Sequence, residues 1–225
     1  MLIYILTLFP RAIEGYLKES ILKIAQEKGL VEIRLYDFRA HAKDRHRTVD
    51  DRPFGGGPGM LLKPEPIFDA VETVEAKEGK FHKVLLTPEG KPFRQEAAAR
   101  LAKVEKLLFL CGRYEGFDER IRQGFEWDEI SLGDFVLSGG EIPALAVVEA
   151  LVRLVPGVVG DSESVVRESF TTGRLDYPQY TRPREFRGMQ VPETLVSGDH
   201  EEVRRWREAE ARKRTHERRP DLESE

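Results

Sequence analysis

Three polar side chains in the second half of the chain have the types needed for acid–base chemistry: Glu168, Asp176 and Arg153. Glu168 stands in Arg167-Glu-Ser-Phe170, and Asp176 stands in Arg174-Leu-Asp-Tyr-Pro178. A carboxylate near an arginine is a candidate general base with a partner that orients it or stabilises developing charge. Because acidic residues are abundant here, spacing alone does not separate a catalytic carboxylate from a surface one.

A ligand site is indicated by two glycine-punctuated loops, Cys111 to Arg120 and Ile130 to Glu141, each entered from an apolar run. Glycine allows positive φ angles and lets a ligand approach the main chain closely. Two such loops side by side would form a pocket walled largely by backbone N–H and C=O groups. Such a pocket suits an adenine and its ribose.

Several common catalytic and nucleotide signatures are absent from the sequence. The loop Gly55-Gly-Gly-Pro-Gly59 lacks the Gly-Lys-Ser/Thr ending of a phosphate loop, and no G-x-G-x-x-G follows the first apolar run. No serine lies in G-x-S-x-G, and the histidines show no metal-ligand spacing, so we expect no metal. The single cysteine, Cys111, ends an apolar run and is expected to be a small core residue.

The apolar pattern predicts an α/β fold with a parallel sheet. A strand from Leu2 to Leu8, a helix from Ile13 to Lys28 and a strand from Val31 to Phe38 form a β–α–β unit, which implies a parallel pair. Further strands are expected at 83–87, 106–111 and 129–132, and further helices at 64–74, 94–103, 117–124 and 141–154. The helix at 141–154 is apolar almost all round, so it is expected to be buried or to lie in a subunit interface.

A change in composition predicts the domain organisation: a first domain at 1–160, a flexible linker at 161–175 and a helical C-terminal domain at 176–225. The last helix should begin at Asp199, with Glu202 completing a capping box. Four arginines of this helix share a narrow arc: Arg204, Arg207, Arg214 and Arg218. That stripe suits a phosphate backbone, although a solvated face laced with ion pairs would have the same pattern.

The length and charge of the chain limit the classes of protein to which it can belong. The 225 residues carry a formal net charge of −4, so the overall balance gives no indication of nucleic-acid binding. No apolar run approaches the roughly 18 residues that a membrane span needs. The apolar segment at the N-terminus lacks the basic region of a signal peptide, so a cytoplasmic protein is expected.

Five motifs, in order, resemble the bacterial tRNA (guanine-N1)-methyltransferases, the TrmD family of the SPOUT class. They are Cys-Gly-Arg-Tyr-Glu-Gly-Phe-Asp-Glu-Arg (111–120), Ser-Leu-Gly-Asp-Phe-Val-Leu-Ser-Gly-Gly-Glu (131–141), Arg-Leu-Val-Pro-Gly-Val-Val-Gly (153–160), Asp-Tyr-Pro-Gln-Tyr-Thr-Arg-Pro (176–183) and Arg-Arg-Trp-Arg (204–207). The glycine loop at 54–60 also fits, and the match spans nearly the whole chain.

The resemblance implies an S-adenosylmethionine (SAM)-dependent enzyme whose parallel α/β domain contains a C-terminal trefoil knot, a rare exception to the rule against knots. It also implies a homodimer with the active site between subunits. The expected SAM-binding residues are Leu86, Pro88, Gly112, Tyr114, Glu115, Leu132, Gly133, Asp134, Phe135, Val136, Leu137, Gly139 and Gly140. Phe135 stands where the family commonly has tyrosine.

The resemblance further implies methyl transfer to N1 of guanine 37 of tRNA. Glu168 would be the base and Arg153 the charge stabiliser, with Asp176 as a second candidate base. Glu168 replaces the family's usual aspartate, which shifts the reach of the carboxylate by about 1.5 Å. The expected RNA contacts are Lys43, Arg45, Arg47, Arg204, Arg207, Arg214 and Arg218. Two alternatives remain: a SPOUT methyltransferase for another RNA, and a non-catalytic RNA-binding module.

Overall fold

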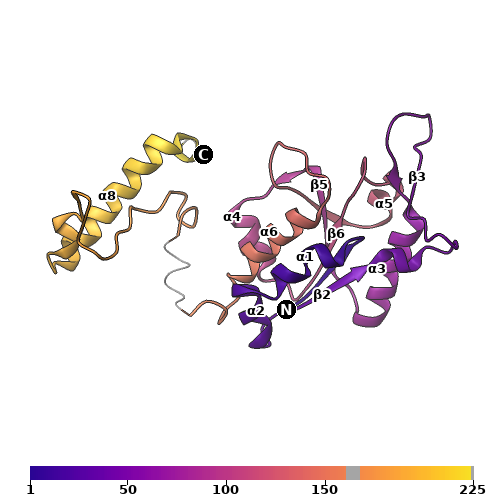
Figure 1. Ribbon diagram of the computed structural model, residues 1–225, viewed down its shortest axis with the longest axis horizontal. Helices are drawn as coiled ribbons and strands as arrows, with labels where there is room; N and C mark the ends of the chain where they lie inside the picture. The colour runs from indigo at the N-terminus through magenta and orange to yellow at the C-terminus, as the bar shows by residue number, and fades with distance from the viewer. Residues whose placement is uncertain (161–167, 224–225) are drawn as a thin grey trace. The chain divides into compact units, whose positions relative to one another are not determined.

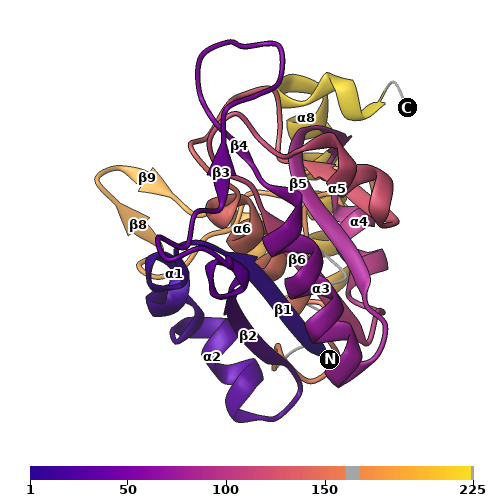
Figure 2. The same ribbon diagram turned by 90° about the vertical axis from the view of Figure 1, so that its right-hand side faces the viewer.

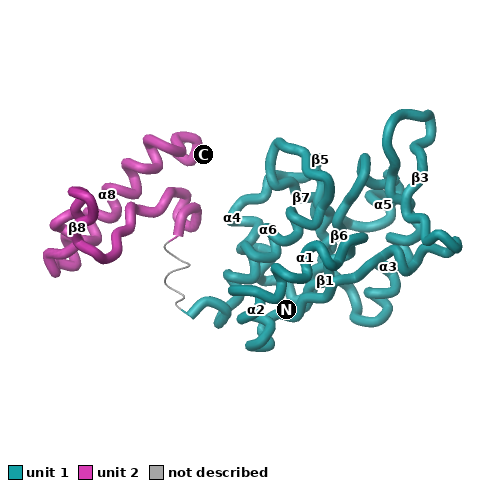
Figure 3. The backbone as a smooth tube through the Cα atoms, in the orientation of Figure 1, with its two compact units in different colours: residues 1–160 teal, residues 161–225 magenta. Residues whose placement is uncertain are grey.

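The structure, a computed structural model, describes residues 1–160 and 168–223. The chain divides into two compact units, residues 1–160 and 161–225, which are coloured separately in Figure 3. Of the linker expected at 161–175, residues 161–167 lie outside the described part, and residues 168–175 are described with the second unit.

The first unit is built on a parallel five-stranded sheet, as the sequence predicts. The strands are β1 (Leu2–Thr7), β2 (Glu32–Asp37), β5 (His82–Pro92), β6 (Lys106–Cys111) and β7 (Trp127–Ser131), in the order β2-β1-β6-β5-β7. The central strand β6 is fully buried from Leu107 to Cys111, because helices cover both faces of the sheet.

Helices cover both faces of the sheet (Figures 1 and 2), and two hydrophobic clusters fill the space between the sheet and these helices. On one face, Phe109 packs with residues of α1 (Pro10–Leu17), α2 (Ser20–Glu27), α4 (Gln95–Leu101) and α6 (Glu141–Val152). On the other face, Leu108 and Leu110 pack with α3 (Pro64–Glu78), α5 (Glu119–Gly124) and the 3-10 turn η1 (Phe38–His41). The apolar helix at 141–154 is therefore largely a core helix.

Several expected boundaries need correction. The single helix predicted at 13–28 is two helices, because the helix is interrupted at Lys18 and Glu19 and Ser20, the first residue of α2, has a positive φ of 50°. The helix predicted at 117–124 begins only at Glu119, since the Asp118 side chain accepts a hydrogen bond from Arg120 N (2.9 Å) and caps it. The strand predicted at 83–87 continues to Pro92 through a break in register between Leu86 and Lys91.

The long segment between η1 and α3 contains a two-residue strand pair, β3 (Asp50–Asp51) with β4 (Leu61–Leu62). The glycine-rich loop 54–59 joins these strands. Gly55, Gly56, Gly57 and Gly59 all have positive φ angles, which side chains rarely tolerate. This explains why the sequence is so rich in glycine at this turn.

The second unit contains the hairpin β8 (Glu185–Phe186) and β9 (Met189–Gln190), the 3-10 turns η2 (Glu193–Val196) and η3 (Pro220–Glu223), and the long helix α8 (His200–Arg218). Asp199 caps α8 as predicted, because its side chain accepts hydrogen bonds from Glu201 N and Glu202 N. Leu175 N donates to Thr215 Oγ1 (3.0 Å), which ties the segment after residue 168 to α8. No helix in the described residues is long and apolar enough to cross a bilayer.

Candidate functional site

A cavity of about 300 Å³ opens where β5, β6 and β7 end. Its walls are residues 86–89 within β5, residues 112–117 after β6, and residues 130–133 and 135–140 from the end of β7 onward, together with Arg122 and Pro143. In open α/β sheets, ligands bind at the carboxyl ends of the strands, so this is the expected edge for a site. The two glycine-punctuated loops therefore meet at one cavity.

The cavity brings together every residue expected from the resemblance to contact SAM, except one. Asp134 does not line it, although its neighbours on both sides do. The expected residues that line it are Leu86, Pro88, Gly112, Tyr114, Glu115, Leu132, Gly133, Phe135, Val136, Leu137, Gly139 and Gly140.

Backbone contacts join the two loops. Gly140 N donates to Gly112 O (2.9 Å), and Arg113 pairs with Gly139 in an isolated antiparallel bridge. A Cβ on Gly140 would lie 2.7 Å from the Cα of Cys111, a distance that real structures do not show. The approach of the chain after β7 to the end of β6 thus requires glycine at this position.

The third glycine loop is also joined to this site. Glu115 N donates to Met60 O (3.0 Å), and Leu62 N donates to Gly116 O (2.9 Å). Tyr114, between them, has a φ of 60°, a left-handed conformation that is rare for a bulky residue. Strained residues of this kind concentrate at functional sites, which agrees with the position of Tyr114 in the cavity wall.

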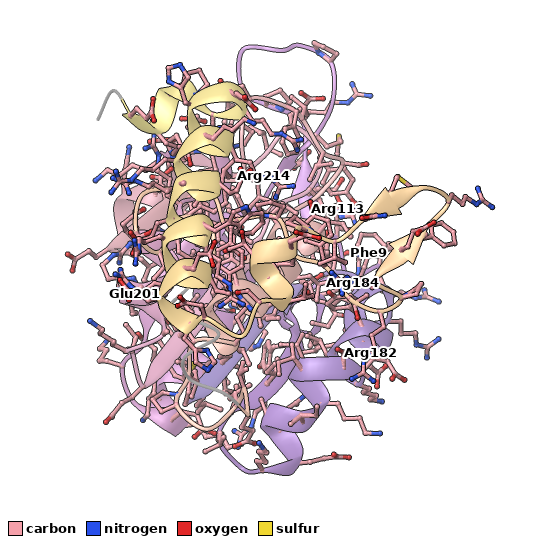
Figure 4. All side chains as sticks on the ribbon, turned by 90° about the vertical axis from the view of Figure 1, so that its left-hand side faces the viewer. Phe9, Arg113, Arg182, Arg184, Glu201 and Arg214 are labelled. Carbon is pink, nitrogen blue, oxygen red and sulfur yellow. The ribbon has the colours of Figure 1, made fainter. Side chains whose placement is uncertain are left out.

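An ion pair between Arg113, which lines the cavity, and the buried Glu141 stabilises the cavity wall. The side chain of Arg113 reaches Glu141 (Nη2 to Oε2, 2.9 Å), and Thr7 Oγ1 donates to the other oxygen of Glu141 (2.6 Å). The guanidinium of Arg113 also lies over the ring of Phe9, 4.4 Å from its centre. Figure 4 labels Arg113 and Phe9 beside each other. The residues singled out in the sequence did not include this group.

A second arginine was also missed. Arg122, from α5, lines the cavity and contacts three acidic side chains: Glu89 (2.9 Å), Glu119 (3.2 Å) and Glu129 (3.3 Å). Burial alone would lower the pKa of this guanidinium, but the surrounding carboxylates raise it. Arg122 therefore stays charged and links its own helix α5 to β5 and β7 beside the cavity.

The candidate catalytic residues fall in different units. Arg153 is the C-cap of α6 in the first unit, whereas Glu168 and Asp176 belong to the second. The Asp176 oxygens accept from Tyr177 N (2.8 Å) and Gln179 Nε2 (2.7 Å), so this carboxylate organises its own turn. Glu168 O accepts from Thr171 N (3.3 Å), and its side chain is half-buried.

The expected RNA-contacting residues also differ in their surroundings. Arg204 is held by Glu201 (2.7 Å) and Glu208 (2.8 Å), so its charge is locally neutralised. Arg207 turns onto the ring of Tyr177, whereas Arg218 is exposed and Arg214 half-buried. Figure 4 shows Glu201 and Arg214 near opposite ends of α8.

In the first unit, Lys43 pairs with Asp69 (3.1 Å), and Arg45 and Arg47 are exposed.

No cluster of histidine, cysteine or acidic residues in the described part of the chain could hold a metal ion. Cys111 is buried, and its burial and the nearby Glu141 raise the pKa of its thiol well above the ordinary value. It is a core residue, as the sequence indicates.

Comparisons with known proteins agree with this geometry. The family described as tRNA (Guanine-1)-methyltransferase TrmD matches residues 1–225. A tRNA (guanine-N(1)-)-methyltransferase of Geobacillus kaustophilus is 56% identical over 222 residues, which cover 99% of this chain and 91% of that protein. The enzymes of the same name from Bacillus subtilis and Dictyoglomus turgidum are 52% and 54% identical, over 99% and 97% of this chain and 92% and 88% of their own lengths. On this full-length match, the chain belongs to the tRNA (guanine-1)-methyltransferase TrmD family.

Proposed function

We propose that this protein transfers a methyl group from SAM to N1 of guanosine 37 of tRNA, next to the anticodon. The observation that carries the proposal is the cavity at the ends of β5, β6 and β7, walled by the motif loops of a TrmD-family chain. Its substrate is an RNA, so the cytoplasm is the compartment in which we expect it to act.

The residues of the cavity fit SAM. Gly112, Gly139 and Gly140 lack a side chain, and a Cβ at any of them would collide with neighbouring atoms, so glycine lets the two loops pack closely around the cavity. Leu86, Leu132 and Leu137 add apolar surface for a flat purine ring. The return of residues 139–140 to the end of β6 supports the trefoil knot that the family resemblance implies.

In the proposed reaction, N1 of guanine gains a methyl group and loses a proton. Bound SAM would supply an electrophilic methyl group, whose bond to sulfur would break as the bond to N1 formed. The carboxylate of Glu168 accepts the N1 proton, because protonated N1 is a poor nucleophile. The guanidinium of Arg153 stabilises the negative charge that develops on O6 of the base.

The target base has to leave the stacked anticodon loop to reach this chemistry, at a cost of about a few kcal/mol. Basic side chains that contact the phosphates would offset this cost. The candidates are Lys43, Arg45, Arg47, Arg204, Arg207, Arg214 and Arg218, of which all but Arg207 and Arg214 are exposed.

A homodimer with the active site at the subunit interface is also part of the proposal. Large apolar side chains beside the cavity are exposed: Val136 by 86%, Ile142 by 59% and Phe9 by 43%. Exposed apolar residues that adjoin a functional cavity are typical of an interaction surface. A second subunit that covered them would also enclose the ligand.

The function is tested by incubating the protein with SAM and tRNA transcripts that carry guanine or adenine at position 37, followed by mass-spectrometric mapping. We expect one methyl group on guanine 37 and none on the adenine transcript. Equal labelling of both transcripts would favour a methyltransferase for another RNA. Absence of any methylated product, together with normal tRNA binding, would favour a non-catalytic RNA-binding module.

A further inference from the structure

The second unit contains a cleft of its own, with a volume of about 530 Å³. It lies between the segment 177–184, the turn η2 and the helix α8. Its volume is within the range of about 300 to 1,000 Å³ that is usual for small-molecule sites. All its lining residues belong to the second unit, so its shape depends on that unit alone.

The cleft is basic. Three arginines line it, Arg182, Arg184 and Arg207, and no acidic residue does. Across residues 1–160 and 168–223, no carboxylate pairs with any of the three, in contrast to Arg204 on the same helix, which contacts Glu201 and Glu208. Unneutralised guanidinium groups around one concave surface favour the binding of an anion.

The cleft is also aromatic. The Arg207 guanidinium lies 4.8 Å from the centre of the Tyr177 ring, and its buried Nε has no hydrogen-bond partner among the described residues. Tyr180 is 50% exposed and is backed by Trp206, with 6.5 Å between the ring centres. Proteins bind single-stranded nucleic acids with two kinds of group: aromatic rings on which bases stack, and basic side chains that contact the phosphates. The cleft has both, an exposed ring and arginines without a paired carboxylate.

We propose that this cleft binds one unstacked nucleotide of the RNA substrate. Arg182 and Arg184, labelled in Figure 4 on the segment that leads to β8, hold its phosphate, and its base stacks on Tyr180. The unpartnered Arg207 Nε donates to a base or phosphate oxygen. The inference rests on the proposed function for the identity of the RNA. It also predicts that the main RNA contact of this unit is the cleft, and not the arginine stripe of α8.

The test measures the dissociation constant of a tRNA transcript from the full-length protein at several salt concentrations. The variants are the double substitution R182Q/R184Q and Tyr180→Ala, with Tyr180→Phe to keep the ring. Arg212→Gln is the matched control, because Arg212 is an exposed arginine of α8 outside the cleft lining. Trp206 fluorescence in a Trp127→Phe background reports directly on the cleft, because these are the two tryptophans of the chain.

We expect Tyr180→Ala to weaken tRNA binding on the order of tenfold and Tyr180→Phe to leave it nearly unchanged, because stacking needs only the ring. The double variant should weaken binding at low salt and reduce the salt slope by about 0.7 for each phosphate that the arginines no longer bind. Arg212→Gln should do neither, and tRNA should quench Trp206. Both effects are changes in tRNA binding, so this test of the cleft is independent of whether guanine 37 is methylated.

The inference is overturned if R182Q/R184Q, with an unchanged circular dichroism spectrum, binds tRNA with the affinity and salt slope of Arg212→Gln. It is also overturned if an acidic peptide quenches Trp206 and tRNA does not, since the cleft would then serve a protein partner. Methylation at saturating tRNA should be retained by the double variant, so that the defect appears in KM rather than in kcat.

Discussion

Arg113 and Glu141 lie 28 residues apart in the numbering and form an ion pair of 2.9 Å at the cavity, which Arg113 lines. The side chain of Glu141 is only 3% exposed and that of Arg113 25%. Glu141 stands in the first turn of α6, where the helix dipole favours a negative charge, and Thr7 from β1 donates to its second oxygen (2.6 Å). One carboxylate therefore connects β1, α6 and the loop after β6.

Glu141→Gln should be strongly destabilising, because it leaves the partly buried Arg113 without its counter-charge. We expect a loss of about 3 kcal/mol in the free energy of unfolding, measured by denaturant titration. SAM should also bind more weakly, since Arg113 would no longer fix the wall. Glu14→Gln is the control: Glu14 forms an exposed pair with Lys18, and the loss of that pair should leave the free energy of unfolding nearly unchanged. Equal effects of the two substitutions would contradict the role of Glu141.

Gly140→Ala tests the close approach of the two loops. The added methyl group would lie 2.7 Å from the Cα of Cys111 and 2.9 Å from Gly112 N, both backbone atoms that cannot move independently. We expect the free energy of unfolding to fall by about 1 to 3 kcal/mol and the affinity for SAM to fall strongly. Thermal melting with and without SAM measures both effects. Gly15→Ala, in α1 with open space around it, should instead stabilise the protein by up to about 1 kcal/mol.

The parallel sheet and the meeting of the two glycine loops could be predicted, because apolar runs identify strands and parallel strands end at a common edge. The break between α1 and α2 could not, since Ile13, Leu17 and Ile21 keep helical spacing across it. The pairing of Thr7, Arg113 and Glu141 depends on tertiary contacts. Its only signal in the sequence was a lone acid at the start of an otherwise apolar helix.

The basic stripe of α8 shows a second limit. Helical spacing correctly puts Arg204 and Arg207 on one arc, but it does not say what each side chain contacts. Arg204 is held by two glutamates of its own helix, whereas Arg207 packs on Tyr177, which lies 30 positions earlier in the numbering. Which arginines keep an unpaired charge is decided by neighbours that periodicity does not identify.

Glu168→Gln tests the proposed base. Glutamine keeps the shape of the side chain but cannot accept the N1 proton, so kcat should fall by about 10² to 10⁴-fold while SAM binding is unchanged. Glu168→Asp, which restores the residue usual in the family, should retain much more activity than glutamine. Glu193→Gln, at an exposed acid of the same unit, is the control. If the glutamine variant kept the wild-type single-turnover rate, Glu168 would not be the general base and Asp176 would be the remaining candidate.

Cys111 provides a reporter of the packing behind the cavity. It is the only cysteine of the chain, is fully buried, and has a thiol whose raised pKa disfavours the reactive thiolate. Ellman's reagent should therefore react very slowly with the native protein. After denaturation it should react rapidly, with one thiol per chain. Gly140→Ala, which disturbs the backbone at Cys111, should accelerate the native reaction, whereas Gly15→Ala should not. Rapid reaction of the native wild type would show that the strand end is open.

Asp128 should make stability depend on pH in the acid range. Burial opposes its charge, but Arg100 (2.8 Å) and His82 (3.0 Å) outweigh that effect and hold the pKa of Asp128 below its ordinary value. A depressed folded-state pKa stabilises the protein above the unfolded-state value of about 3.9, and this contribution is lost as the pH falls through the folded-state pKa. The gap in unfolding free energy between wild type and Asp128→Asn should therefore be present at pH 7 and shrink in acid. Arg100→Gln should reduce the same pH-dependent gap, and a gap that stayed constant down to pH 2 would contradict the ion pair.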